Sequence, residues 1–197
     1  MQQLEQFVAH LLYWQEHKNL IAKSTVAHIW GRHVLDSAQL YRLLPPELTF
    51  LDSRHALVDI GSGAGFPAIV LAILGIRRVI MVESQQSKAR FLTEVKTKLN
   101  LDCAIHPVRL EQLSQDFCTP LTIRVFTARA VAPLTTLLSY CASRATPTTR
   151  GFFFKGRSWP EEIAEAKKNW KLNYRIHPSI TEPESAIIEI MEFKKRS

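Results

Sequence analysis

The sequence predicts an α/β protein with a mostly parallel sheet and a C-terminal antiparallel hairpin, preceded by a helical N-terminal extension. Short apolar runs alternate with helix-like segments from residue 56 onward. Strands that alternate with helices form a parallel sheet with helices on both faces. The last two apolar segments, 174–176 and 187–193, are separated only by a proline-containing turn with no room for a helix. Parallel neighbours need a long crossover, so this pair indicates a hairpin.

The first 50 residues carry apolar side chains at helical spacing. We expect Ser24 to cap the start of the second helix in this region and Pro45-Pro46 to end it. The positions with this spacing are Leu4, Phe7, Val8, Leu11, Leu12 and Trp14 in the first helix, and Ile29, Trp30, His33, Val34, Leu40, Tyr41 and Leu44 in the second.

Residues 55–193 are predicted to form a Rossmann-like core. The expected strands are 56–60, 79–82, 103–108, 123–128 and 151–154, and the expected helices are 66–74, 87–99, 133–141 and 160–170. A chain of 197 residues can bury one sizeable core but not two. We therefore expect one domain over residues 1–197, with residues 1–50 as its helical extension.

The overall charge favours a polyanionic partner. Lys and Arg number 25 against 18 Asp and Glu, which gives a net charge of +7, and binding to phosphates releases counterions. No apolar stretch reaches the length of a membrane span and no signal-peptide pattern is present, so we expect a cytoplasmic protein. Cys103, Cys118 and Cys141 form no C-x-x-C pair, and we expect buried free thiols and no metal site.

The strongest chemical signal is the glycine-rich segment that follows the first expected strand. It reads Asp-Ile-Gly-Ser-Gly-Ala-Gly-Phe-Pro over residues 59–67. Gly61, Gly63 and Gly65 let the backbone approach a ligand at the carboxyl edge of the sheet. The spacing is G-x-G-x-G, whereas a dinucleotide fingerprint is G-x-G-x-x-G and would need glycine in place of Phe66. Asp59 suits the cationic end of a ligand better than a pyrophosphate.

Glu83 closes the second expected strand, about 20 residues beyond the glycine-rich segment. A carboxylate at this place can accept both ribose hydroxyls of an adenosine. S-adenosylmethionine and NAD both carry that ribose, so Glu83 alone does not choose between them. Together with the G-x-G-x-G spacing, it favours S-adenosylmethionine, and the predicted sheet has the layout of class I methyltransferases.

Four stretches of the chain resemble the RsmG (GidB) family, the bacterial 16S ribosomal RNA guanine-N7 methyltransferases. Trp-Gly-Arg-His-Val-Leu-Asp-Ser at 30–37 is similar to the family's W-x-R-H-x-x-D-S helix, and residues 59–67 to its glycine loop. Ala-Arg-Ala at 128–130 resembles the turn after its fourth strand, and Lys-Gly at 155–156 the turn after its fifth. Order and spacing fit over nearly the whole chain.

The resemblance implies the cofactor, the substrate and a set of contacts. The cofactor would be S-adenosylmethionine, and the partner would be 16S ribosomal RNA or the small ribosomal subunit. Separately from the resemblance, we expect a monomer. The resemblance and the glycine loop together predict cofactor contacts from Gly61, Gly63, Gly65, Phe66, Glu83, Leu110, Glu111 and Arg129. Basic or aromatic residues expected to contact RNA are Arg32, His33, Lys88, Lys155 and Arg157.

The sequence lacks the motifs that methylation of an exocyclic amine or of a pyrimidine carbon needs, and this agrees with guanine N7 as the methyl acceptor. Enzymes that methylate exocyclic amines usually carry a D/N-P-P-Y type turn after the fourth strand, and residues 127–133 contain none. Methylation of pyrimidine carbon 5 needs a nucleophilic cysteine, which these turns also lack. Guanine N7 has a free lone pair and loses no proton, so we expect no general base and assign no catalytic residue.

Two other functions stay open at this point. The chain could methylate a protein or a small molecule, in which case turnover would not depend on ribosomal RNA and would respond little to salt. It could instead be a non-enzymatic RNA-binding module, in which case it would fail to bind S-adenosylmethionine. The three intact glycines of the loop argue against the second alternative.

Overall fold

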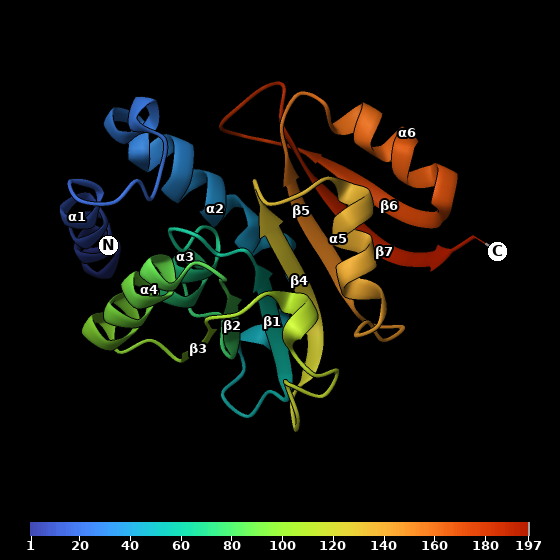
Figure 1. Ribbon diagram of the computed structural model, residues 1–197, viewed down its shortest axis with the longest axis horizontal. Helices are drawn as coiled ribbons and strands as arrows, with labels where there is room; N and C mark the ends of the chain where they lie inside the picture. Colours follow the sequence, from blue (N-terminus) through green and yellow to red (C-terminus); the bar gives the residue numbers. More distant parts are fainter. Residues whose placement is uncertain (197) are drawn as a thin grey trace.

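The computed structural model describes residues 1–196 and contains a seven-stranded sheet of order β3-β2-β1-β4-β5-β7-β6 (Figure 1). Strand β7 runs antiparallel to both of its neighbours, and the other neighbouring pairs are parallel. The predicted fold class is therefore confirmed. The strands are β1 (His55–Ile60), β2 (Val79–Val82), β3 (Cys103–His106), β4 (Thr122–Arg129), β5 (Arg150–Lys155), β6 (Trp170–Pro178) and β7 (Ala186–Lys195).

Helices cover both faces of this sheet (Figure 1). One face packs against α1 (Gln2–Gln15), α3 (Ala68–Ile73) and α4 (Gln86–Leu99). The other face packs against α5 (Leu134–Ala142) and α6 (Trp159–Asn169). Successive side chains of a strand point to opposite faces of the sheet. In β1, Leu57 packs in the hydrophobic cluster on the face with α1, α3 and α4, and Val58 packs in the cluster on the face with α5 and α6.

The segment between α1 and β1 is helical but irregular. It contains η1 (Lys23–His28), the π-helical η2 (Trp30–Leu35), α2 (Asp36–Ala38), η3 (Gln39–Leu43) and η4 (Pro46–Thr49). The predicted N-cap at Ser24 is wrong, since the first turn starts earlier, with Ala22 as its N-cap. The amide and hydroxyl of Thr25 both donate to the Ala22 carbonyl, at 2.9 and 2.8 Å. Leu44 takes an extended conformation before Pro45-Pro46, as the sequence predicts.

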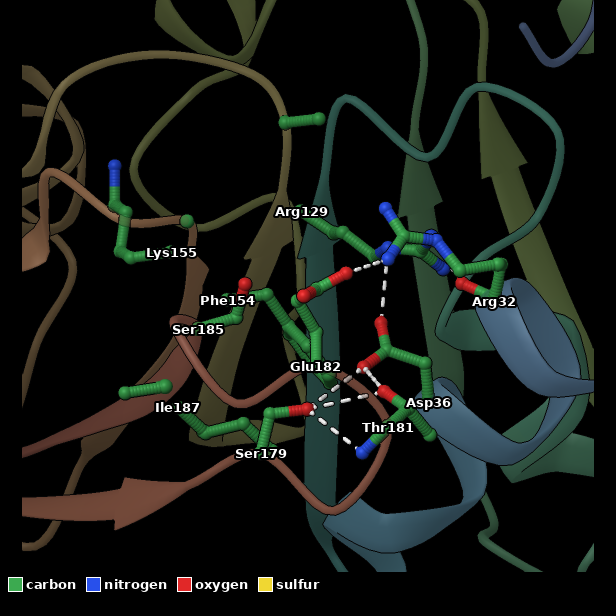
Figure 2. A pocket seen from close by; sticks show the side chains of 13 residues that line it. Arg32, Asp36, Arg129, Phe154, Lys155, Ser179, Thr181, Glu182, Ser185 and Ile187 are labelled. Carbon is green, nitrogen blue, oxygen red and sulfur yellow. Dashed lines mark hydrogen bonds and ion pairs between the residues drawn. The ribbon is translucent and has the colours of Figure 1, made fainter. Parts of the chain in front are cut away.

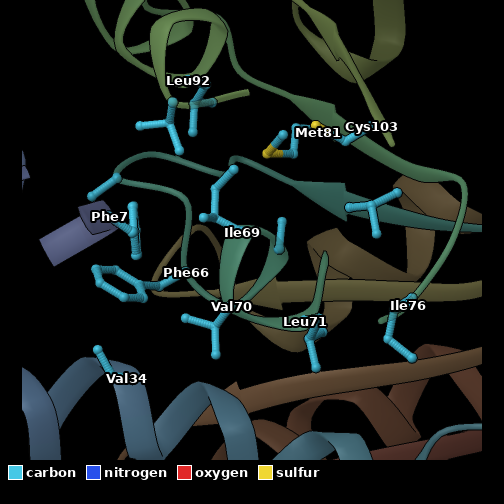
Figure 3. Close-up of a cluster of buried hydrophobic side chains, with 14 of the residues drawn as sticks. Phe7, Val34, Phe66, Ile69, Val70, Leu71, Ile76, Met81, Leu92 and Cys103 are labelled. Atoms are coloured by element: carbon cyan, nitrogen blue, oxygen red, sulfur yellow. The ribbon is translucent and has the colours of Figure 1, made fainter. Parts of the chain in front are cut away.

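The N-terminal helices share a hydrophobic core with the sheet (Figure 3). Phe7 of α1 is fully buried, and its ring centroid lies 5.3 Å from that of Phe66 and 6.4 Å from that of Phe91. Val34 of η2 and Val70 of α3 belong to the same cluster. The N-terminal extension thus packs directly on the segment that follows the glycine loop.

The C-terminal hairpin is longer than predicted. Strand β6 begins at Trp170, directly after α6, and pairs with β7 from Trp170 to Pro178. The predicted strand at 174–176 is only the centre of this element. In β6 the partly or fully buried side chains alternate with exposed ones up to Ile176, which makes β6 a one-sided edge strand.

Cys103, Cys118 and Cys141 are free and buried, as expected. Within residues 1–196, no group of three or more His, Cys, Asp or Glu residues is arranged to hold a metal ion. None of the helices in that range combines the length and the apolar character that a membrane crossing needs.

Candidate functional site

The carboxyl ends of β1, β2 and β4 meet at one edge of the sheet. Ile60 of β1 pairs with Val82 of β2 on one side and with Ala128 of β4 on the other. These strands are parallel, so the segments that follow them lie side by side: the glycine loop (residues 61–67), Glu83 and Arg129. This is the edge at which α/β proteins bind ligands.

Glu83 holds the glycine loop in place. Its two carboxylate oxygens accept hydrogen bonds from the backbone N–H of Gly63, at 2.8 Å, and of Gln85, at 2.7 Å. The Gly61 N–H donates to the Val82 carbonyl at 2.8 Å. A carboxylate offers about four acceptor positions. Glu83 therefore shapes the loop and still has capacity for the hydroxyls of a ligand.

The end of the loop is packed too tightly for a side chain at Gly65. A Cβ at this position would lie 2.6 Å from Cγ1 of Ile69, and the φ angle of Gly65 is +88°. Phe66 follows, and its ring stacks on the imidazole of His33 with a centroid distance of 5.0 Å. The loop is thereby joined to the N-terminal helices as well as to α3.

Asp59 lies beneath the loop and not in it. The side chain is fully buried, and its Oδ1 accepts a hydrogen bond from the Thr127 hydroxyl at 2.7 Å. Its Oδ2 is buried and has no hydrogen-bond partner among the described residues. Burial raises the pKa of Asp59 from 3.8 to about 7. The expected contact with a cationic ligand end is not supported, because Asp59 does not line the cavity in front of the loop.

The cavity in front of the glycine loop has a volume of about 520 Å³. We call it the cofactor cleft; its lining residues are Leu20, Ile21, Ala22, His33, Gly61, Ser62, Gly63, Ala64, Phe66, Glu83, Ser84, Gln85, Lys88, Arg129, Ala130 and Val131. A smaller cavity of about 100 Å³ shares Gly61, Ser84 and Val131 with it. Leu110 and Glu111, in the short turn η5 (Leu110–Gln112), line this smaller cavity.

Both cavities suit a ligand that ends in an adenosine. Glu83 lines the cleft and has acceptor capacity left over, as ribose hydroxyls require. The first backbone N–H groups of η5 have no acceptor within that turn, so they are free to meet the edge of an adenine. Nη1 of Arg129 is buried without a partner among residues 1–196, so a donor is left for a carboxylate. The residues present therefore fit S-adenosylmethionine.

Arg129 is the centre of a charged network at the end of β4. Its Nη2 donates to the Arg32 carbonyl at 2.9 Å and to Nδ1 of His33 at 2.7 Å, and its Nε lies 3.3 Å from Oδ2 of Asp36. The guanidinium also lies over the Phe66 ring, 5.6 Å from its centroid. Burial and the nearby cations Arg129 and Arg32 lower the pKa of His33 from 6.5 to about 4, so this histidine is neutral.

A third cavity, of about 260 Å³, shares Arg129 and Ala130 with the cofactor cleft. Figure 2 shows the side chains that line this third cavity. We call it the outer pocket. Its walls come from η2, the start of α2, the end of β4, the end of β5, the β6–β7 turn (residues 179–185) and the start of β7. The remaining lining residues are Arg32, Asp36, Phe154, Lys155, Gly156, Ser179, Thr181, Glu182, Ser185, Ala186 and Ile187.

The side chains expected to contact RNA lie in different environments. Lys88 lines the cofactor cleft and has no ion-pair partner within residues 1–196. Arg32 pairs with Glu182, and the exposed Arg157 pairs loosely with Glu184 at 3.6 Å. The two remaining side chains are largely enclosed, because His33 is stacked on Phe66 and Lys155 is buried.

Two of the three donors of the Lys155 ammonium group are used inside the protein. Its Nζ lies 2.7 Å from Oε2 of Glu162 and donates to the Ala132 carbonyl at 2.6 Å. The same Glu162 oxygen accepts the Leu134 N–H at 2.8 Å. This geometry joins β5, α6 and the start of α5, and it holds the Lys155 side chain in place.

Two polar residues of the site were not predicted from the sequence. Asp36 follows Arg32 by four residues and His33 by three, so helical spacing alone could have placed it on their side of the helix. Glu182 lies 150 residues from Arg32 along the chain, and no local pattern indicates that the two side chains meet.

The geometry agrees with three comparisons to known proteins. Residues 1–190 match the family model described as GidB: rRNA small subunit methyltransferase G. The Ribosomal RNA small subunit methyltransferase G of Rhodospirillum rubrum is 38% identical over 195 residues, which is 99% of this chain and 92% of that protein. The protein of the same name from Cereibacter sphaeroides is 39% identical over 193 residues, covering 95% of this chain and 87% of that protein.

Among solved structures, a point mutant of MtNAS in complex with S-adenosylmethionine is similar in fold, with a TM-score of 0.60 and 14% sequence identity. The similarity covers 96% of this chain and 72% of that one. This structural similarity supports the fold assignment only, whereas the family assignment depends on the sequence matches. The glycine loop held by Glu83, the Arg129 network and the nearly full-length sequence matches agree, and the chain belongs to the GidB family, rRNA small subunit methyltransferase G.

Proposed function

We propose that this protein transfers a methyl group from S-adenosylmethionine to N7 of a guanine in 16S ribosomal RNA. The observation that carries the proposal is the pair of adjoining cavities at the end of β4. The cofactor cleft has the glycine loop and Glu83 on one side, and Arg129 and Ala130 separate it from the outer pocket. A base in the outer pocket would lie next to the cofactor, as in-line methyl transfer requires.

The cofactor contacts follow from the same geometry. When bound, S-adenosylmethionine supplies an electrophilic methyl group on a sulfonium. Glu83 accepts the ribose hydroxyls, while Leu110 and Glu111 meet the adenine in the smaller cavity. Arg129 offers its free Nη1 to the carboxylate of the cofactor. Gly61, Gly63 and Phe66 line the cleft, so the loop lies close to the ligand. Gly65 acts indirectly, by letting the end of the loop pack closely on Ile69.

Methylation of N7 asks only for positioning, because the lone pair attacks without loss of a proton. The described side chains around Arg129 agree with this requirement. His33 is neutral and its Nδ1 already accepts a hydrogen bond from Arg129, so it is not available as a base. The Asp36 carboxylate is bound by Arg129 and by Thr181, whose hydroxyl donates at 2.7 Å. Neither group is directed to take a proton from the acceptor.

The net charge of +7 favours RNA as the partner. Lys88, Arg32 and Arg157 are the candidates for direct phosphate contacts, because Lys88 has no ion-pair partner among residues 1–196 and the other two have exposed partners. Lys155 and His33 act indirectly, by holding the turns around the pocket. We further infer that the chain acts as a single-domain monomer in the cytoplasm, without a metal ion.

The test is methyl transfer from labelled S-adenosylmethionine to small-subunit RNA and to assembled small subunits, both from a strain that lacks this gene. We expect 7-methylguanosine as the product. A Gly63→Asp variant should lose both activity and cofactor binding, because its side chain would project into the cleft. Gly75→Asp is the matched control, since Gly75 also has a positive φ angle, +103°, but lies outside the cleft.

Each of the two alternative functions predicts its own outcome in this experiment. Cofactor binding without labelling of either RNA substrate would point to a protein or a small molecule. Failure of the wild-type protein to bind S-adenosylmethionine would exclude methyltransferase activity altogether.

A further inference from the structure

Two carboxylates line the outer pocket, and they differ in how many hydrogen-bond and ion-pair partners they have. Oδ1 of Asp36 accepts hydrogen bonds from Gln39, Ser179 and Thr181, and its Oδ2 faces Arg129. Only about 15% of the Asp36 side chain is exposed. Asp36 therefore has no free capacity for a ligand, and its role is to fix Arg129 and the β6–β7 turn.

Glu182 is the other carboxylate, and it has a single partner. Its Oε2 pairs with Nη1 of Arg32, whose side chain is 46% exposed, while that of Glu182 is 36% exposed. No other hydrogen bond to the Glu182 carboxylate is present within residues 1–196. An ion pair between side chains this exposed costs little to open. Arg32 and Glu182 both line the outer pocket (Figure 2). Glu182 can therefore exchange Arg32 for a ligand that enters this pocket.

We propose that Glu182 recognises the target guanine by accepting hydrogen bonds from its N1–H and its N2 amino group. This inference rests on the proposed function and names the residue that selects the base. Arg32, released from Glu182, is then free to pair with a neighbouring phosphate. The pair thus lines the outer pocket in the free enzyme and divides into two RNA contacts when the base enters.

The chemistry of guanine supports this assignment. N1–H and the N2 amino group are two donors on one edge of the base, and the two oxygens of a carboxylate match them. N7 lies on the other side of the base. A base held at N1 and N2 from the β6–β7 turn leaves N7 free to face the cofactor cleft behind Arg129 and Ala130. Adenine presents an unprotonated N1 on that edge, which a carboxylate repels.

The test combines variants of Glu182 with a substrate that lacks one donor. Methylation is measured on substrates carrying either guanine or inosine at the target position, because inosine lacks the N2 amino group and keeps N7. We expect the kcat/KM of the wild-type enzyme to fall roughly 10-fold or more with inosine, as for loss of a hydrogen bond to a charged group. Glu182→Ala should be slower on guanine by a similar factor and should treat guanine and inosine alike.

Glu184→Ala is the matched control, because Glu184 belongs to the same turn, pairs with the exposed Arg157 and does not line the outer pocket. It should keep the preference of the wild-type enzyme for guanine. Glu182→Ala should also keep the wild-type affinity for S-adenosylmethionine and the wild-type Tm, which separates loss of recognition from loss of folding.

The proposal is overturned if Glu182→Ala keeps the guanine preference, or if the wild-type enzyme methylates both substrates equally. These outcomes leave 7-methylguanosine as the product, and so they leave the proposed function intact. Absence of 7-methylguanosine with the wild-type enzyme on both free RNA and assembled subunits would overturn the proposed function as well.

Discussion

Nη2 of Arg129 lies 2.7 Å from Nδ1 of His33, and this contact fixes the state of the imidazole. A guanidinium only donates, so Nδ1 accepts and the ring proton is on Nε2. Nε2 in turn donates to the hydroxyl of Thr25 at 2.8 Å, while that hydroxyl donates to the Ala22 carbonyl. A neutral histidine thus connects the cofactor cleft to the first turn of the N-terminal extension.

This contact predicts how Arg129 contributes to cofactor binding. Arg129→Ala should weaken S-adenosylmethionine binding roughly 10-fold or more, because it removes the donor for the carboxylate of the cofactor and frees His33. Isothermal titration calorimetry measures the change, with Arg90→Ala as the control, since Arg90 is an exposed partner of Glu94. Unchanged cofactor affinity and unchanged RNA turnover in Arg129→Ala would refute the assignment.

His33 should make the stability of the protein depend on pH. Its pKa is about 4 in the folded protein and 6.5 without the fold, so between these values the unfolded chain binds more protons. The contribution of His33 to the free energy of unfolding therefore rises with pH across this window, by up to about 3 kcal/mol. Urea unfolding of the wild-type protein and of His33→Gln at several pH values measures it. A wild-type minus variant difference that is flat from pH 4 to 6.5 would contradict this prediction.

Asp59 should have the opposite effect in an overlapping window. Its pKa is raised from 3.8 to about 7 by burial, so between these values the folded protein binds more protons than the unfolded chain. The contribution of Asp59 to stability therefore falls as pH rises from about 4 to 7, by up to about 4 kcal/mol. Asp59→Asn should gain stability relative to the wild-type protein over that range and no further above it. A constant difference between the two proteins would show that Asp59 is ionised throughout.

Gly65, in the glycine loop, and Gly75, outside it, both have positive φ angles but should differ in how much an alanine destabilises the protein. Gly65→Ala places a Cβ 2.6 Å from Cγ1 of Ile69, whereas Gly75→Ala meets nothing within 4 Å. Both variants strain the backbone, so the difference between them reports the clash. We expect Gly65→Ala to lower the free energy of unfolding by about 1–3 kcal/mol more than Gly75→Ala does. Equal Tm values for the two variants would mean that Ile69 moves aside freely.

The sequence predicts the cofactor side of the site well because its signals are local. The glycine loop and Glu83 each follow an apolar strand directly, and parallel strands bring their carboxyl ends to one edge. The sequence predicts β6 too short, because polar residues at the exposed positions interrupt the apolar pattern of an edge strand that starts at Trp170. Its true length follows from pairing with β7, which is a tertiary contact.

The outer pocket could not be predicted from the sequence. It requires the β6–β7 turn to meet η2 and α2, and the hydrogen bonds from Ser179 and Thr181 to Asp36 in α2 join residues more than 140 positions apart. Polar residues in a turn look the same in the sequence whether they are solvated or line a pocket. The same limit applies to Lys155, whose place in a Lys-Gly turn does not reveal its pairing with Glu162.

The two lysines of the site should therefore respond differently to substitution. Lys155→Met removes a buried cation and leaves Glu162 without its ion-pair partner, so we expect a loss of about 1–3 kcal/mol in the free energy of unfolding. Lys88→Ala should leave stability unchanged and weaken RNA binding, with the slope of log affinity against log salt smaller by about 1. Chemical denaturation and salt-dependent RNA binding measure the two effects. If Lys155→Met unfolds like the wild-type protein but loses one unit of salt dependence, Lys155 is a phosphate contact and its pairing with Glu162 opens on RNA binding.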